Sequence, residues 1–192
     1  MIPNTTNPNA AIQQQQWKTY SDEKLGLSLQ YPSTWEVKPK QNRFERMPDL
    51  RFVGDGFVFS INKAEGFSLS LFEMAGAAEE ELVDKDPTAR IIEDINTHQH
   101  TIDGEKAAAF LYIHDGTSGL KVTQVMIPKH GLNAYILAFT GDSSNFDQNK
   151  AIMDHFFNSI KYLDGISSSN SSNDDDNNNN GQAAQGPSLL PS

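Results

Sequence analysis

Two histidines at alternate positions are the residues of this chain best spaced for metal chemistry. His98 and His100 stand in a run that favours a β-strand, so both side chains point to one face, about 6.6 Å apart along the chain. Such a pair can hold Zn²⁺ or Cu²⁺ when a third ligand arrives. The alternative is a pair of polar strand histidines that bind nothing, and it is the interpretation we favour.

Acidic side chains form a second candidate site. They lie on a segment that favours a helix: Glu79, Glu80, Glu81, Asp84 and Asp86. A solvated helix face is the usual outcome of such a run, and docking of a basic partner is the alternative. Further along, Asp174–Asn180 lacks the alternating ligands, glycine and closing glutamate of an EF-hand loop. We expect a soluble spacer there, with loose Ca²⁺ binding as the alternative.

Motifs of the common enzyme classes are missing from the sequence. It has no Gly-x-Ser-x-Gly elbow, no glycine-rich phosphate loop and no His-Glu-x-x-His pair. It also has no cysteine, which excludes disulfides, thiolate metal ligands and a cysteine nucleophile. We therefore expect neither an enzyme nor a cofactor, although a small hydrolase whose triad assembles from distant residues stays open.

The net charge of the chain limits the classes of partner that it can bind. The formal net charge is −10, and Asp174–Asp176 supply three of these charges. Because the rest is spread over the domain, the surface repels phosphate backbones and anionic lipids. We expect no nucleic-acid binding. No run of about 18 apolar residues occurs, so we also expect no membrane insertion.

Composition divides the chain into three parts. Residues 1–16 are polar and Gln-rich and predict a disordered leader, whereas residues 165–192 predict a disordered Asn/Ser/Asp-rich tail. Residues 17–164 hold the apolar pattern of one globular domain. Glycosylation-type triplets begin at Asn4 and Asn170, in the flanks. The first residues lack the basic end and apolar core of a signal peptide, so the chain is either cytoplasmic or a mature or shortened form.

Strand and helix signals alternate along the domain. A strand ends at Tyr31-Pro32, and Trp35 soon follows, either to cover the sheet edge or to face a ligand; we favour the first. Further predicted strands are Phe57–Asn62, Phe67–Glu73, Lys121–Ile127 and Asn133–Thr140. The predicted helices are Ala77–Asp84, Asp86–Asp94 (with Asp86 as N-cap before Pro87) and Asn145–Asn158.

The clearest local prediction is a hairpin at Asp103-Gly104, a dipeptide suited to a two-residue turn. A tight turn places Ile102 opposite Glu105, His100 opposite Ala107 and His98 opposite Ala109. His114 then falls on the other face and supplies no third ligand. Since Glu105–His114 is apolar on both faces, both must be covered. The sequence thus predicts an α+β fold with a central antiparallel β-sheet sandwiched between helices.

The order of these elements resembles the PsbP family, whose founding members are extrinsic subunits of the photosynthetic oxygen-evolving complex. The matching pieces are Tyr20-Ser21-Asp22, Gly26–Pro32 with Trp35, Thr101–Ala107, Tyr135–Thr140 and Asn158–Lys161. They span nearly all of residues 17–163.

The resemblance implies a PsbP-like α-β-α architecture and a protein that binds and stabilises others. The chain has no plastid transit peptide and no match to the N-terminal segment of the photosystem subunits, so we expect a non-photosynthetic branch. The leading hypothesis is a non-enzymatic binding or assembly module. It would be monomeric and extracytoplasmic, and its expected partner is a protein, with a membrane-associated complex as one option.

Two alternatives to this hypothesis stay open. One is a metal-ion (Zn, Cu or Ca) carrier or sensor that uses His98 and His100. The other is an extrinsic subunit of the photosystem II type. The calcium or manganese handling attributed to some family members has no identifiable ligands on this chain.

Overall fold

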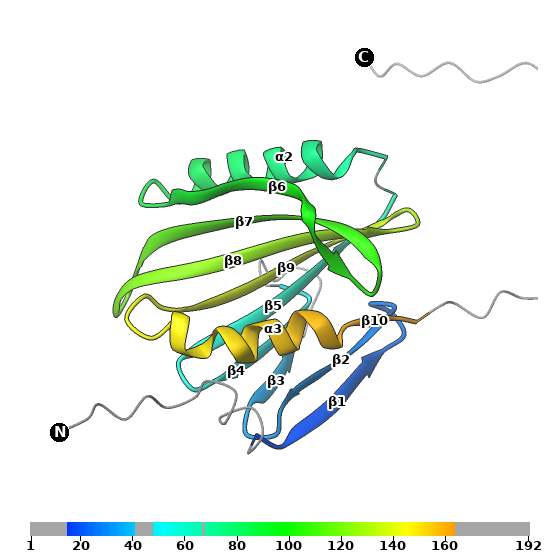
Figure 1. Cartoon of the computed structure of the whole chain (residues 1–192), viewed down its shortest axis with the longest axis horizontal. Coiled ribbons are helices and arrows are strands. Elements are labelled where there is room, and N and C mark those ends of the chain that lie inside the picture. The colour runs from blue at the N-terminus through cyan, green and yellow to red at the C-terminus, as the bar shows by residue number, and fades with distance from the viewer. Residues whose placement is uncertain (1–14, 41–47, 67, 164–192) are drawn as a thin grey trace, which may run out of the picture.

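The part of the chain that the structure describes folds into two antiparallel sheets and two α-helices. The computed structural model describes residues 15–40, 48–66 and 68–163, so the predicted leader and tail lie almost wholly outside the described residues. The large sheet has the order β3-β4-β5-β9-β8-β7-β6, and the small sheet has the order β1-β2-β10 (Figure 1).

The strands of the large sheet are β3 (Glu36–Pro39), β4 (Leu50–Gly54), β5 (Phe57–Ala64), β6 (Arg90–Ile102), β7 (Glu105–Gly116), β8 (Gly119–His130) and β9 (Asn133–Asp142). Those of the small sheet are β1 (Trp17–Asp22), β2 (Leu27–Pro32) and β10 (Lys161–Tyr162). The helices are α2 (Leu71–Lys85) and α3 (Lys150–Ser159), with a 3₁₀ turn, η1 (Asp147–Asn149), before α3.

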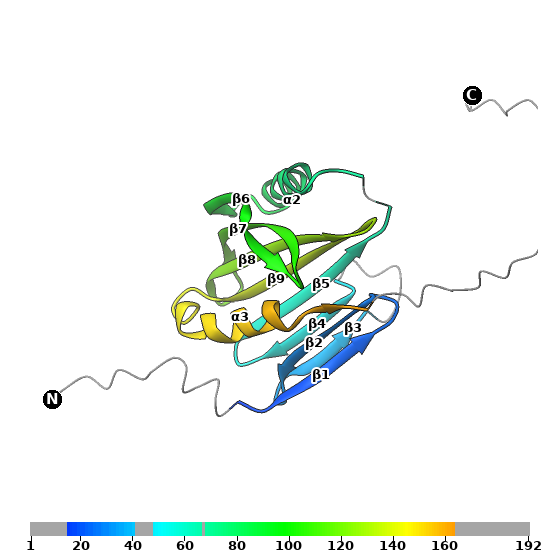
Figure 2. The ribbon, with the colours of Figure 1, turned by 45° about the vertical axis from the view of Figure 1, so that its right-hand side comes forward.

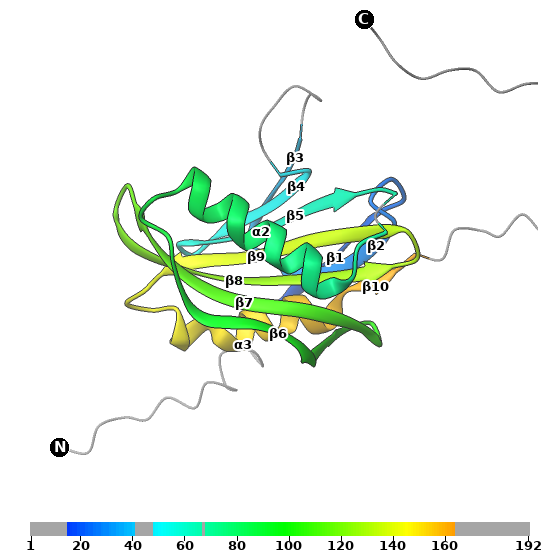
Figure 3. The same cartoon turned by 90° about the horizontal axis from the view of Figure 1, so that it is seen from above.

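Each helix packs on its own hydrophobic cluster. Phe156 and Phe157 of α3 join a large cluster with Phe59 and residues of the small sheet. Met74 and Ala75 of α2 join a second cluster with alternate residues of β7 and β8. In Figure 2, β7, β8 and β9 lie between α2 above and α3 below, and Figure 3 shows α2 running across the sheet. No helix within the described ranges is long and apolar enough to cross a membrane.

The antiparallel sheet is confirmed, but the predicted helical sandwich holds only in part. The molecule is richer in β-structure than expected, because the small sheet shares the α3 side of the core with that helix. The sequence signals of β1, β3 and β4 were not recognised. Two of these strands carry local hairpin signals: β1 joins β2 through the short turn at residues 23–26, and β4 joins β5 through Asp55-Gly56, whose φ of 52° and 80° suit a two-residue turn. β3 has no such signal, because its Pro39 pairs with Leu50 across a long connection.

Two predicted elements near α2 are wrong. The predicted strand Phe67–Glu73 overlaps the start of α2, since Ser70 and Glu73 form a capping box: Ser70 N–H donates to Glu73 Oε2 (2.8 Å) and Glu73 N–H donates to Ser70 Oγ (3.3 Å). The predicted helix Asp86–Asp94 does not form. Asp86 instead accepts hydrogen bonds from Thr88 N (2.9 Å) and Oγ1 (2.6 Å), which makes a turn that leads into β6.

The predicted hairpin is confirmed at its turn. Asp103 and Gly104 have φ of 50° and 82°, as a type I′ turn requires. The Ile102–Glu105 and His100–Ala107 pairs form as predicted. The pair predicted for His98 is wrong: Asn96 lies opposite Ala109, because an irregularity places extra β6 residues between Asn96 and His100.

The corner after β2 has the structural role that we favoured. Trp35 N–H donates to Pro32 O (3.0 Å), and the indole Nε1–H donates to Asp55 Oδ2 (2.8 Å). The Trp35 ring is buried and lies directly on Gly54. A buried indole whose N–H is satisfied packs this end of the core and presents no surface to a ligand.

Candidate functional site

The predicted histidine pair is only partly visible. His100 is half-buried and pairs with Ala107, on the α3 side of the sheet, whereas the side chain of His98 lies outside the described residues. His114 packs beside Tyr112, on the α2 side (ring centroids 5.3 Å apart), so it lies on the opposite face as expected. No group of three His, Asp or Glu side chains suited to a metal gathers among the described residues.

The metal site therefore stays a prediction. Zinc titration of the purified protein tests it, with His98→Ala/His100→Ala as the control. A site at these residues predicts that the double variant loses a stoichiometric zinc; equal binding by both proteins would contradict it.

Two histidine–carboxylate pairs occur elsewhere among the described residues: His130 lies beside Glu105, with Nδ1 and Oε1 3.5 Å apart, and His114 lies beside Asp86, between β7 and the end of α2. His114 Nδ1 lies 3.4 Å from Asp86 Oδ2. Hydrogen bonds from Thr88 hold the pKa of Asp86 below its usual range. A catalytic dyad would need His114 Nε2 to reach a nucleophile, but Nε2 is buried and bonds to none of the described residues. Asp115 N–H also donates to Thr88 Oγ1 (2.9 Å). The polar cluster of Asp86, Thr88, His114 and Asp115 therefore holds the α2–β6 connection against β7.

A second polar cluster joins the two sheets. Asp103 accepts hydrogen bonds from Lys161 Nζ (2.6 Å) and Tyr162 N (2.9 Å), which together lower the pKa of its carboxyl. The ring of Tyr162 stacks on His130, with centroids 4.2 Å apart, and burial raises the pKa of its phenol. These contacts tie β10 to the β6–β7 turn. They explain the cluster as a structural junction.

The outward side of α2 differs from both clusters because its side chains face solvent. The helix buries a stripe of residues at helical spacing: Leu71, Met74, Ala75, Ala78 and Leu82. The adjacent stripe holds Phe72, Gly76, Glu79 and Val83, where Phe72 is 63% exposed and Val83 is 47% exposed. Exposed apolar side chains that gather on one side of an element are a common feature of interaction sites, so this side of α2 is the candidate functional surface.

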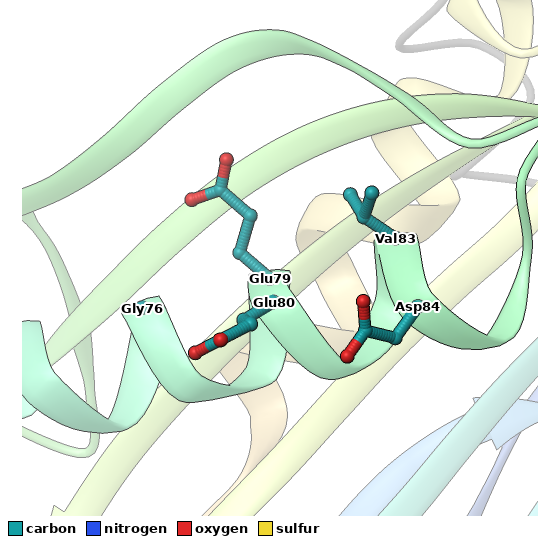
Figure 4. A pocket seen from close by; sticks show the side chains of 5 residues that line it. All are labelled: Gly76, Glu79, Glu80, Val83 and Asp84. Atoms are coloured by element: carbon teal, nitrogen blue, oxygen red, sulfur yellow. The ribbon is translucent and has the colours of Figure 1, made fainter.

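Carboxylates flank this apolar stripe. α2 carries five acidic residues against one lysine, and that lysine, Lys85, pairs with Glu81. Glu79, Glu80 and Asp84 form no ion pair within the part of the chain that the structure describes. A shallow hollow of about 330 Å³ is lined by Gly76, Glu79, Glu80, Val83 and Asp84. Figure 4 shows Glu79 and Val83 rising together from α2, while Glu80 and Asp84 project to another side.

We call Phe72, Gly76, Glu79, Glu80, Val83 and Asp84 the α2 outer face. The sequence identified its acids but missed its apolar members. The spacing of residues 72, 76, 79 and 83 carries the signal, one helical step beside the buried stripe. This spacing did not predict an apolar stripe, because the predicted strand Phe67–Glu73 placed Phe72 outside the helix.

A match with a family model covers residues 4–162, and the family is described as PsbP-like protein. The chain belongs to the PsbP-like family. This confirms the resemblance drawn from the Tyr31-Pro32 corner, the Asp103-Gly104 turn and the strand near Tyr135. No significant sequence match was found among curated proteins.

Solved structures of similar proteins agree with the family assignment. Cyanobacterial PsbP (CyanoP) from Synechocystis sp. PCC 6803 is 13% identical, with a TM-score of 0.61 over 84% of this PsbP-like chain and 97% of its own. LpqN of Mycobacterium tuberculosis, described as involved in cell envelope biogenesis, is 12% identical, with a TM-score of 0.54 over 82% and 97%. At such identities the likeness shows the fold alone.

Proposed function

We propose that this PsbP-like protein is a non-enzymatic binding or assembly module that holds a partner protein on its α2 outer face. The observation that carries the proposal is the pair Phe72 and Val83, exposed on one side of a helix whose other side is packed in the core. Because part of each side chain is already covered, burying the exposed remainder would favour association by about 1 kcal/mol each. The two polar clusters, by contrast, are explained by the contacts that they make within the fold.

The proposal includes an extracytoplasmic location, supported by family membership and by the description of LpqN as involved in cell envelope biogenesis. A role as a photosystem II subunit has less support, since CyanoP shares the fold at 13% identity.

Site-specific photo-cross-linking in the native organism tests the function. A photoreactive amino acid replaces Phe72 or Val83 in one set of cells, and Leu132 or Leu120 in the control set. The controls are matched in exposure, at 69% and 43% against 63% and 47%. We expect one protein to be cross-linked from positions 72 and 83 and not from the controls. The same products from all four positions, or none from α2, would contradict the function.

A further inference from the structure

Gly76 has no evident structural role in the fold. It lies inside α2, where glycine is less favourable than alanine because its backbone loses more conformational freedom on folding. Glycine is otherwise retained where a positive φ or a close neighbour demands it. Gly76 has neither, since its φ is not positive and a Cβ at this position would meet no described atom within 4 Å beyond its chain neighbours and the backbone of its own helix. Nothing in the described residues therefore explains the missing side chain.

A close approach by another backbone does explain it. Gly76 lies between Phe72 and Val83 in the apolar stripe and at the edge of the hollow. Because Gly76 has no side chain, a second chain can pack directly against the helix backbone, with apolar contacts to Phe72 on one side and Val83 on the other. Small residues permit such close helix approaches in general, because no Cβ holds the backbones apart.

Charge then decides which occupant fits. The carboxylates of Glu79, Glu80 and Asp84, which form ion pairs with none of the described residues, disfavour an anionic lipid surface. They also disfavour a second copy of α2, which would bring like charges together. Residues 1–14 and 164–192 contain no Lys or Arg, so the chain's own ends offer no complementary charge. A cationic segment of another protein fits both the apolar and the charged parts of the surface.

We propose that the α2 outer face receives a basic amphipathic segment of a partner protein. Its backbone passes over Gly76, its apolar side chains cover Phe72 and Val83, and its Lys or Arg side chains pair with Glu79, Glu80 and Asp84. This rests on the proposed function and specifies the chemistry of the partner.

The test is a selection of random peptides displayed on phage against the immobilised full-length protein, followed by affinity measurements with the synthesised winners. We expect enriched peptides with net positive charge and apolar residues at helical spacing, whose affinity falls with added salt. Glu80→Gln/Asp84→Asn should weaken them about tenfold, whereas Glu36→Gln, which removes a carboxylate on β3, should not.

Gly76→Ala gives the sharper comparison, because its two effects have opposite signs. It should raise Tm by about 1–4 °C, since alanine favours the helix, and should weaken the selected peptides about tenfold by filling the approach. Asn158→Ala, which also introduces an alanine at an exposed helical position but lies on α3, should leave binding unchanged.

Several results would overturn the inference. The first is a selection that enriches neutral or acidic peptides, or no peptide. The second is equal peptide affinity of the wild type and Gly76→Ala. The third is a dimer seen by sedimentation that Gly76→Ala dissociates. The outcome can be separated from that of the proposed function. If positions 72 and 83 cross-link a partner through a segment that is not basic, the function stands and this inference fails. If basic peptides bind as expected but no partner is cross-linked, the function fails instead.

Discussion

The two faces of the large sheet are covered to different degrees. The α3 face is closed by aromatic rings: Phe52, Phe59, Phe139 and Phe156 are all fully buried. The α2 face is packed with smaller side chains, such as Ala75, Ala108 and Ala134. Its helix leaves Phe72 and Val83 in water. Rings buried on all sides contribute to stability, whereas exposed apolar side chains contribute nothing until something covers them.

This difference assigns separate roles to the two faces. Substitutions on the α3 face should act on the free energy of unfolding, whereas substitutions on the α2 outer face should act on binding. A surface kept for binding need not be optimal for stability, and Gly76 inside a helix is an example.

The largest effect should come from Phe156→Ala. This ring is fully buried and stacks on Phe59, with centroids 4.6 Å apart. Its removal leaves a cavity and should cost about 3–5 kcal/mol of unfolding free energy, measured by urea denaturation. Phe72→Ala deletes the same ring atoms at an exposed position, so it should lower the unfolding free energy by well under 1 kcal/mol. Similar losses for the two variants would remove the distinction between the faces.

A pair of glycines sharpens the contrast. A Cβ at Gly54 would lie 2.3 Å from Cδ1 of the buried Trp35, so Gly54→Ala must displace that ring. We expect a loss of about 1–3 kcal/mol and altered tryptophan fluorescence. Gly76→Ala should instead gain about 0.5–1 kcal/mol. Equal signs in thermal unfolding would contradict this comparison.

A smaller effect is expected at the junction of the sheets. Asp103→Asn keeps a residue that tolerates positive φ but removes the charge that pairs with Lys161. We expect a loss of about 1 kcal/mol at neutral pH. The folded pKa of Asp103 is lowered, so its stabilisation is present above the unfolded pKa of 3.8 and is lost as pH falls through the folded value. Unfolding curves of the two proteins should therefore converge in acid; a constant difference would contradict this account.

The smallest effect is the pH dependence from His155. Its ring stacks on Trp17 (3.6 Å between centroids), and burial lowers its pKa from 6.5. The unfolded chain thus binds this proton more readily, so stability is greatest above pH 6.5 and falls as pH drops from there towards the folded pKa. His155→Gln should flatten this part of the Tm–pH curve. Parallel curves for the two proteins would show that His155 does not contribute.

Local signals account for what the sequence predicted well. Asp103-Gly104 predicted its turn because the required positive φ is a property of those two residues. The two-sided apolar pattern of β7 indicated that both faces of the sheet are covered. Signals that compete with one another were harder to interpret. Asp86-Pro87 has the chemistry of a helix start, but the same carboxylate bonds to Thr88 and His114 and begins a turn.

The wrong strand register predicted for His98 also results from local signals that compete with one another. Asn96 Oδ1 accepts a hydrogen bond from Gln99 N (3.2 Å), and such local bonds compete with the ladder. An irregularity of this kind on an edge strand cannot be seen from alternation alone, so His98 was placed opposite Ala109. For a related reason, the sequence predicted only part of the α2 outer face. Acidic residues are visible as charge in a sequence, whereas the exposure of Phe72 depends on where the helix begins.

The measurement that tests the central claim most directly compares two double variants in the native organism. Phe72→Ser/Val83→Ser alters the α2 outer face, and Leu132→Ser/Leu120→Ser alters apolar side chains of matched exposure elsewhere. Unfolding free energy and recovery of the protein cross-linked from α2 are measured for both. We predict that both variants keep the stability of the wild type within about 1 kcal/mol and that only the α2 variant loses the partner, by about tenfold or more. Equal recovery of the partner by the two variants would contradict the claim that α2 is the binding surface.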